Sequence, residues 1–294
     1  MSARATLGGG IGLLVLAGIW QFGVSPRWTQ RVPPGWSTRV QYVGSANAPD
    51  PVTGAFRGSG KVEHYERAQH VISEAGRPDW IELEERYTVG DPVTGNPVFE
   101  YVTRDTIDPR TGAHTDARHR GAIALFPRKV EPRTYRFRSN YVSGIALKFE
   151  RRDVLEGLPT FVFSYRGPLD QTVAYANSRG TFGGLRVAAG QVIRCLDDQF
   201  YYRIWVEPAT GEQVKLEEGC PSGDYIHDSV TGRPLAAIAQ WTGVTAGDDL
   251  TTRILEIRAE RWKYLWGSRY IGLTLALAGA VLTAVGMRPR TGRG

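Results

Sequence analysis

Two long apolar segments frame the chain, and the residues between them alternate between apolar and polar side chains. The first segment, Ala5–Val24, carries no charge and is long enough to cross a bilayer core of about 30 Å. The sequence that follows it, SPRWTQ, lacks the small residues of a cleavage site. Residues 1–27 are therefore predicted to form an uncleaved transmembrane signal anchor, with a cleavable signal peptide as the alternative.

The second apolar segment, Tyr270–Met287, predicts a transmembrane helix over residues 270–288, followed by a basic tail over residues 289–294. Aromatic and basic side chains at its start are typical of residues that anchor a helix at the membrane surface. The residues predicted to contact lipid headgroups or partner subunits are Trp262, Lys263, Tyr264, Trp266, Arg269 and Tyr270.

Small residues recur at four-residue intervals in both apolar segments, a spacing that places them on one face of a helix. They are Gly8 and Gly12 in the first segment and Gly272, Ala276, Ala280 and Ala284 in the second. Such stripes let helix backbones approach closely, so we expect the two helices to pack on each other or on a partner. The alternative is that small residues are simply common in membrane helices.

Between the two segments, short runs of alternating apolar and polar residues are typical of half-buried antiparallel strands. The clearest runs are Lys61–Arg67, Trp80–Val89, Val98–Ile107, Thr134–Arg138, Thr160–Tyr165, Thr172–Ala176 and Tyr201–Glu207. We therefore predict a mainly β fold, an antiparallel β-sandwich or barrel-like domain over residues 28–247. Within Thr134–Arg138, Tyr135 and Phe137 are expected to face inward and the two arginines outward.

The segment DPVTG and its relatives DPRTG, EPATG and DSVTG recur along this region. The copies occupy residues 50–54, 91–95, 108–112, 207–211 and 228–232. In a turn, the acidic side chain accepts hydrogen bonds from backbone N–H groups just downstream, Pro fixes φ, and Gly adopts the left-handed conformation. The motif is therefore predicted to be a tight turn and not a ligand site.

Residues 248–269 have a different pattern, with no Gly or Pro before Gly267 and an acidic start at Asp248 or Asp249. The apolar residues at near-helical spacing are Leu250, Ile254, Ile257 and Trp262. We predict an amphipathic juxtamembrane helix that leads into the second span, with a strand as the alternative.

Cys195 and Cys220, the only two cysteines, bracket two predicted strands joined by the turn at residues 207–211. Antiparallel pairing of these strands would bring the cysteines together, so a disulfide is expected, with two buried free thiols as the alternative. A disulfide favours an oxidising compartment for the β domain. The positive-inside rule points the other way, because Arg and Lys residues flank the domain more densely than the tails, and charge therefore leaves the topology open.

The formal net charge of +6 comes from arginines that are scattered along the chain, and no nucleic-acid-binding motif is present, so no nucleic acid partner is predicted. The histidines do not follow a zinc-site spacing and are expected at the surface. They are His64, His70, His114, His119 and His227. A crowded stretch holds Ser222, Asp224, His227 and Asp228. Because triad members normally converge from separated segments, we predict a non-enzymatic protein without catalytic, cofactor-binding or metal-binding residues.

Three longer stretches carry a resemblance to a known family. They are RTGAHTDARHRGAIALFPRKVEPRTYRF at Arg110–Phe137, EGLPTFVFSY at Glu156–Tyr165 and WVEPATGEQVK at Trp205–Lys215. Together with the two apolar segments, they resemble the PorA-like family of two-span bacterial envelope proteins with an extracytoplasmic β-rich domain. The two spans and the expected disulfide predict a protein of the bacterial inner (cytoplasmic) membrane, with both termini cytoplasmic and the large domain periplasmic or extracellular. The family's porin label implies a channel role, but two helical spans and the lack of long strands with an outward apolar band depart from a pore.

The sequence thus predicts a non-enzymatic, membrane-anchored scaffold or accessory subunit that docks on and stabilises a larger membrane protein complex, for example a respiratory or photosynthetic one. The alternative is a porin-like or lipid-handling envelope protein whose β domain encloses a channel or an apolar cavity. The expected partners are membrane lipids and other integral membrane subunits, and no cofactor is expected.

Overall fold

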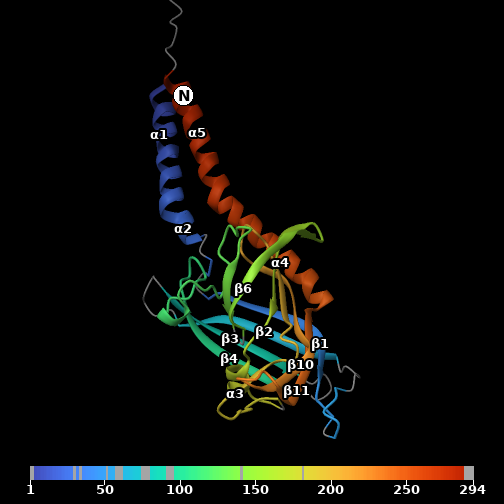
Figure 1. Ribbon diagram of the computed structural model, residues 1–294. Coiled ribbons are helices and arrows are strands. Elements are labelled where there is room, and N and C mark those ends of the chain that lie inside the picture. The colour runs from blue at the N-terminus through green and yellow to red at the C-terminus, as the bar shows by residue number, and fades with distance from the viewer. Residues whose placement is uncertain are drawn as a thin grey trace, which may run out of the picture. The chain divides into compact units, whose positions relative to one another are not determined.

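The computed structural model describes residues 3–28, 31–32, 35–50, 52–56, 62–73, 80–90, 96–139, 142–180 and 182–287. The chain divides into two compact units, one built from Met1–Pro33 with Arg258–Gly294 and the other from Pro34–Ile257. The first unit is helical and the second, the β domain, is mainly β; Figure 1 labels many of their helices and strands.

Two long helical segments enter the helical unit. The first comprises α1 (Ala3–Ile19), the π-helical turn η1 (Trp20–Val24) and α2 (Ser25–Trp28). The second comprises α4 (Gly247–Leu265), the π-helical turn η3 (Trp266–Tyr270) and α5 (Ile271–Met287). By length and composition, Ala5–Val24 and Gly247–Met287 are both able to cross a membrane.

The strands of the β domain pair in antiparallel fashion. They are β1 (Ser37–Asn47), β2 (Val62–Ser73), β3 (Ile81–Gly90), β4 (Pro97–Ile107), β5 (Tyr135–Ser139), β6 (Val142–Leu155), β7 (Leu158–Gly167), β8 (Gln191–Cys195), β9 (Phe200–Val206), β10 (Gln213–Asp228) and β11 (Pro234–Thr245). Within the described ranges they form one sheet of eleven strands in the order β4-β3-β2-β1-β11-β10-β9-β7-β6-β5, with β8 paired to β10. The predicted mainly β, antiparallel fold is confirmed, and the sheet does not close into a barrel.

The gap between the two edge strands, β4 and β5, is spanned by a segment that we call the seam (residues 107–126). Isolated bridges connect Ile107 to His114, Ala113 to Ile123 and Ile123 to Phe137, so the seam pairs with both edges. The N–H of Ile123 donates to a carbonyl of β5 at 2.9 Å, and its carbonyl accepts from β5 at 3.0 Å. Covering both edges in this way satisfies backbone groups that an open sheet would leave unpaired.

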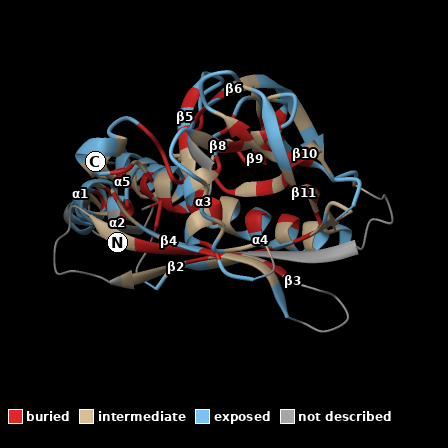
Figure 2. Ribbon diagram, turned by 60° about the horizontal axis from the view of Figure 1, so that its bottom comes forward, coloured by how far each residue is buried: buried red, intermediate tan, exposed pale blue. Residues whose placement is uncertain are grey.

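Large aromatic side chains fill the core on the inner face of the sheet, among them Tyr42, Phe163 and Phe200. Tyr135 and Phe137 of β5 are buried, whereas the arginine between them is exposed, as the alternation predicts. Figure 2 shows buried residues, in red, along the strands and exposed residues in the connections.

The first part of α4 covers the opposite face of the sheet. Ile254 and Ile257 are almost fully buried against Val162, Trp205 and Val214. Burying each isoleucine contributes about 1.5–3 kcal/mol relative to exposing it, so α4 is a packed element of the β domain. The helix prediction is confirmed and the strand alternative is wrong. At its start, Asp249 accepts a hydrogen bond from the backbone N–H of Gln41 at 3.1 Å, which ties the helix to β1.

Four copies of the recurring motif are described, except for Pro51 in the first, and all four are turns. In each copy the acid accepts a hydrogen bond from the backbone N–H two residues downstream at 2.8–3.0 Å. The closing glycines adopt left-handed φ values of 68–76°. The turn prediction is confirmed for these copies, and the copy at residues 91–95 lies outside the described residues.

One predicted strand is wrong. Residues 172–176 belong to the short helix α3 (Thr172–Asn177). Asp170 accepts a hydrogen bond from the N–H of Thr172 at 2.9 Å, and the N–H of Tyr175 donates to the carbonyl of Gln171 at 3.0 Å, which closes the first helical turn. Alternation over so few residues does not distinguish a strand from one helical turn.

Candidate functional site

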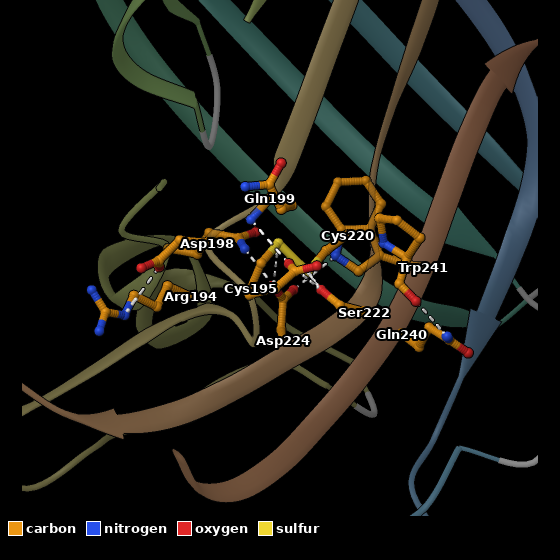
Figure 3. Close-up of a disulfide and its surroundings, with 12 residues drawn as sticks. Arg194, Cys195, Asp198, Gln199, Cys220, Ser222, Asp224, Gln240 and Trp241 are labelled. Atoms are coloured by element: carbon orange, nitrogen blue, oxygen red, sulfur yellow. Dashed lines mark hydrogen bonds and ion pairs between the residues drawn. A yellow bond between two sulfur atoms is a disulfide. The ribbon is translucent and has the colours of Figure 1, made fainter. Parts of the chain in front are cut away.

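Cys195 and Cys220 form a disulfide, with their Cα atoms 5.8 Å apart. The β9–β10 hairpin is antiparallel as predicted, but Cys195 ends a separate strand, β8, that pairs with the later half of β10. In this pairing Asp224 lies directly opposite Cys195. Figure 3 shows the carboxylate of Asp224 beside the disulfide, and its Oδ1 lies 3.8 Å from Cys195 Sγ.

Asp224 is fully buried and accepts hydrogen bonds from three neutral side chains. Gln171 Nε2 donates to Oδ1 at 2.6 Å, and Tyr175 Oη donates to Oδ2 at 2.7 Å. Trp241 Nε1 donates to Oδ2 at 2.7 Å. These donors come from the residue before α3, from α3 itself and from β11, so the fold gathers the site from separate parts of the chain.

Burial raises the pKa of Asp224 to about 6, although the hydrogen bonds from Tyr175, Trp241 and Gln171 oppose that rise. Desolvation disfavours the charged carboxylate, and donors aimed at the oxygens favour it. The group is therefore ionised at neutral pH and takes up a proton in mildly acidic solution.

A cavity with about 460 Å³ of empty space, including its opening to solvent, lies next to the side chains that hold this carboxylate. Its apolar wall is formed by Ala46, Val89, Phe99, Ala174, Phe182 and Ala239. Gln171, Tyr175 and Trp241 also line the cavity, so the side chains that hold Asp224 form its polar floor. Ligand pockets typically combine apolar walls with a few fixed polar groups in this way.

The crowded stretch at Ser222–Asp228 does not assemble a nucleophile. Ser222 Oγ donates to Asp197 Oδ1 at 2.7 Å, and His227 Nδ1 donates to the carbonyl of Gly232 at 3.1 Å. His227 is buried, so its expected surface position is wrong.

His114 and His119 lie together in the seam, with ring centroids 5.5 Å apart, because residues 117–119 form a 3-10 turn. The His114 side chain has no exposed surface and that of His119 is 28% exposed, so the expectation of two surface histidines is wrong for His114. Burial lowers the pKa of His114 and keeps its ring neutral. His64 and His70 lie in β2, and their side chains are not among those that the structure describes.

The profile of the Porin PorA family matches residues 3–288, which span both helical segments and the β domain. The chain belongs to this family. A comparison with curated proteins found no match. Membership in the PorA family and the two apolar helices together indicate a bacterial membrane protein.

The helix pair of this PorA-family chain packs on glycines spaced seven apart. A Cβ atom at Gly272 would lie 2.9 Å from Gln21 Oε1, and one at Gly279 would lie 2.9 Å from the carbonyl oxygen of Gly10. One at Gly286 would lie 2.8 Å from the backbone nitrogen of Leu7. Two helices that cross at a shallow angle present the same face every seven residues, which explains the spacing.

Most of the remaining small residues of the predicted stripes are exposed. Gly8 and Gly12 are exposed, with nothing within 4 Å of an added Cβ, so they do not contact α5. Ala280 and Ala284 are also exposed, and Ala276 is half-buried. The prediction that Gly8 and Gly12 pack on α5 is therefore wrong. That they pack on a partner protein stays a prediction.

Three of the predicted membrane-surface residues, all aromatic, stack in a row along one face of the helix. The rings of Trp262, Trp266 and Tyr270 follow one another with centroids 5.4 Å apart, and all three are exposed. Lys263 and Arg269 are exposed as well. Tyr264 is only 7% exposed and does not belong to this surface.

Sequence reasoning missed the three donors to Asp224. Gln171 and Tyr175 lie in and next to a segment that alternation assigned to a strand, and Trp241 lies in a strand that was not recognised. One signal was available in the sequence. Asp224 follows Cys220 by four residues, so a strand through both would place a carboxylate close to a disulfide.

Proposed function

We propose that the chain is a membrane-anchored envelope protein of the PorA family whose β domain holds an apolar, lipid-like molecule in the cavity beside Asp224. The cavity carries this proposal, because its apolar wall and polar floor match the composition of a small-molecule site. Two apolar helices would keep the domain at a membrane, where lipids are the most abundant apolar molecules. The hydroxyl, amide and indole donors of the floor stay bonded to Asp224, so the apolar wall would make most of the contacts with such a molecule.

The test is mass spectrometry of lipids extracted from the full chain after purification in mild detergent, followed by binding of a fluorescent fatty acid. Ala174→Phe fills the cavity wall, and Val173→Phe places the same ring on the exposed side of α3. Bound lipid in the native chain and in Val173→Phe, with at least a tenfold weaker affinity in Ala174→Phe, supports the proposal. Equal binding by the two variants contradicts it.

The disulfide supports a β domain on the oxidising side of the inner membrane, with both termini in the cytoplasm. Intact cells treated with a membrane-impermeant maleimide should label Cys195 and Cys220 only after reduction. Labelling that requires lysis but not reduction would place the domain in the cytoplasm.

A channel is the second candidate, and membership in a family of porins favours it. Two helices per chain are too few to enclose a water-filled pore, so a channel would need several copies. The exposed small residues Gly8, Gly12, Ala280 and Ala284 would let helices of neighbouring copies approach closely. The same surface would serve an accessory subunit, with helices of other membrane proteins in place of further copies.

Crosslinking in native membranes and conductance in planar bilayers separate these roles. A Gly8→Leu/Gly12→Leu variant should abolish assembly, whereas Gly18→Leu, on a different face of α1 and also without a close neighbour, should not. Crosslinks between copies together with discrete conductance steps support a channel. Stoichiometric crosslinks to other proteins support an accessory subunit, and a monomer without conductance contradicts both.

A further inference from the structure

The imidazole of His114 leaves one ring nitrogen unpartnered at the centre of the seam. His114 Nε2 lies 3.1 Å from the backbone carbonyl oxygen of Arg138 on β5. A carbonyl only accepts hydrogen bonds, so Nε2 carries the proton and Nδ1 presents a lone pair. Nδ1 is buried and has no hydrogen-bond partner among the described residues. A buried polar atom left in this way costs about 1–3 kcal/mol unless a ligand satisfies it.

The lone pair faces other acceptors. Asp105 Oδ1 lies 3.7 Å from His114 Nδ1, and Asp116 Oδ2 lies 4.0 Å from it. His119 Nδ1 is 2.7 Å from Asp116 Oδ1, and Arg138 forms an ion pair with Asp105. A neutral imidazole surrounded by carboxylates offers several lone pairs to one small volume, which is the environment that a cation requires.

We propose that His114, Asp116 and His119 bind a divalent transition metal ion, with zinc as the reference metal. One ligand atom from each of these residues lies within 4.8 Å of the other two. Two imidazoles and a carboxylate are ligands that Zn²⁺ accepts, whereas Mg²⁺ and Ca²⁺ prefer oxygen alone. The bond from Nε2 to a backbone carbonyl is the outer contact that fixes the orientation of a metal-binding histidine.

Local structure already positions the remaining ligands. Asp116 caps the 3-10 turn by accepting hydrogen bonds from the N–H groups of Arg118 and His119, and this turn brings His119 back toward His114. The side chains of Asp116 and His119 are 34% and 28% exposed, which gives an ion a route from solvent.

The site lies between the two edges of the sheet. Asp105 belongs to β4, and His114 is bonded to β5 through Arg138. A bound ion would therefore fasten the seam where the sheet does not close. A second cluster of ligand types among the described residues, Cys195, Cys220 and Asp224, does not offer an equivalent site, because its sulfur atoms form a disulfide and three donors occupy its carboxylate.

The experiment uses the full chain without a histidine tag, in mild detergent, after removal of metals with a chelator. Zn²⁺ is titrated against a chromophoric chelator, and Co²⁺ is added to a second sample to record its visible absorption. Asp116→Asn keeps an acceptor for the turn but removes the charge, and His119→Gln changes a partly exposed ligand. Asp108→Asn is the matched control, because Asp108 accepts hydrogen bonds in a seam turn but is not one of the three ligands.

We expect one Zn²⁺ per native chain and per Asp108→Asn chain, and at least a tenfold loss of affinity in Asp116→Asn and His119→Gln. The Co²⁺ spectrum of the native chain should show the intense visible bands of a protein-bound ion, and these bands should weaken in His119→Gln. Substoichiometric Zn²⁺ in the native chain, or unchanged affinity in both ligand variants, would overturn the proposal.

Discussion

Two buried polar clusters of the β domain differ in how their hydrogen-bonding groups are satisfied. At Asp224, one carboxylate accepts three hydrogen bonds from neutral donors, and a disulfide lies beside it. At His114, a ring nitrogen and nearby carboxylates present lone pairs to one another, and none of the described residues donates to Nδ1. The first cluster is complete within the folded chain, and the second is not.

The difference separates groups that stabilise the fold from groups that are available to a ligand. A satisfied buried carboxylate is costly to remove, because its donors lose their partner. An unsatisfied buried nitrogen already costs free energy in the folded chain. Without a ligand, replacing such a group should therefore lower the free energy of unfolding less than replacing a satisfied carboxylate. With a bound ligand, the loss should be larger. Four measurements, from the largest expected effect to the smallest, test this contrast.

Asp224→Ala should lower the free energy of unfolding by about 3–5 kcal/mol, because three buried donors are left without an acceptor. Urea unfolding of the full chain in mild detergent, followed by tryptophan fluorescence, measures the loss. Asp170→Ala, which removes one exposed turn acceptor, should cost about 1 kcal/mol. Similar losses in the two variants would show that the Asp224 cluster is not a stabilising network.

Removal of the disulfide by Cys195→Ser with Cys220→Ser should cost roughly 3 kcal/mol, because the bond closes a loop with a sequence separation of 25. The same urea titration, with and without reductant, measures this effect. The native chain should respond to the reductant and the double variant should not. An unchanged unfolding midpoint in the double variant would contradict the prediction.

The native chain should lose stability relative to Asp224→Asn as the pH rises from about 4 to about 7. The folded pKa of Asp224 is about 6, above the ordinary value of 3.8, so the folded state holds the proton more tightly than the unfolded state. The stabilisation from the protonated form is fully present below pH 3.8 and is lost as the pH passes the folded pKa. The expected change is about 2–3 kcal/mol, and parallel pH profiles of the two chains would exclude it.

Asp116→Asn should change the stability of the metal-free chain by no more than about 0.5 kcal/mol, because asparagine caps a helical turn as well as aspartate does. Saturating Zn²⁺ should raise the unfolding midpoint of the native chain but not that of the variant. Thermal unfolding by circular dichroism, with and without Zn²⁺, gives both values. If Zn²⁺ raised the unfolding midpoints of the two chains equally, Asp116 would not be a ligand, and the His114 cluster would not differ from the Asp224 cluster in its availability to a metal ion.

Alternation in the sequence located the middle strands well, because one face of each strand is buried and the other is not. The predicted run at residues 98–107 corresponds to β4, and the predicted run Tyr201–Glu207 is offset by one residue from β9. β11 was missed because its alanines and glutamine, in PLAAIAQW, give little contrast between the two faces. Helix α3 was assigned wrongly because it is too short for its period to be recognised.

The candidate sites were less accessible to sequence reasoning. The donors to Asp224 arrive from α3 and β11, and no spacing in the chain connects Gln171 with Trp241. His114, Asp116 and His119 are neighbours in the sequence, but the burial of His114 depends on the pairing of the seam with both β4 and β5. A local pattern carries no information about such long-range pairing, so the histidines resembled surface residues.

The pairing of β1 with β11 has a practical consequence for dissecting the protein. The first and last strands of the β domain are antiparallel neighbours, with Tyr42 opposite Thr245, so the chain enters and leaves the domain at the same end of one strand pair. A fragment that begins near Pro34 and extends past Ile257 retains the complete sheet and the buried turns of α4. Soluble expression of this fragment, or its circular permutation through a short linker between the two ends, would free the domain from detergent for crystallography and NMR.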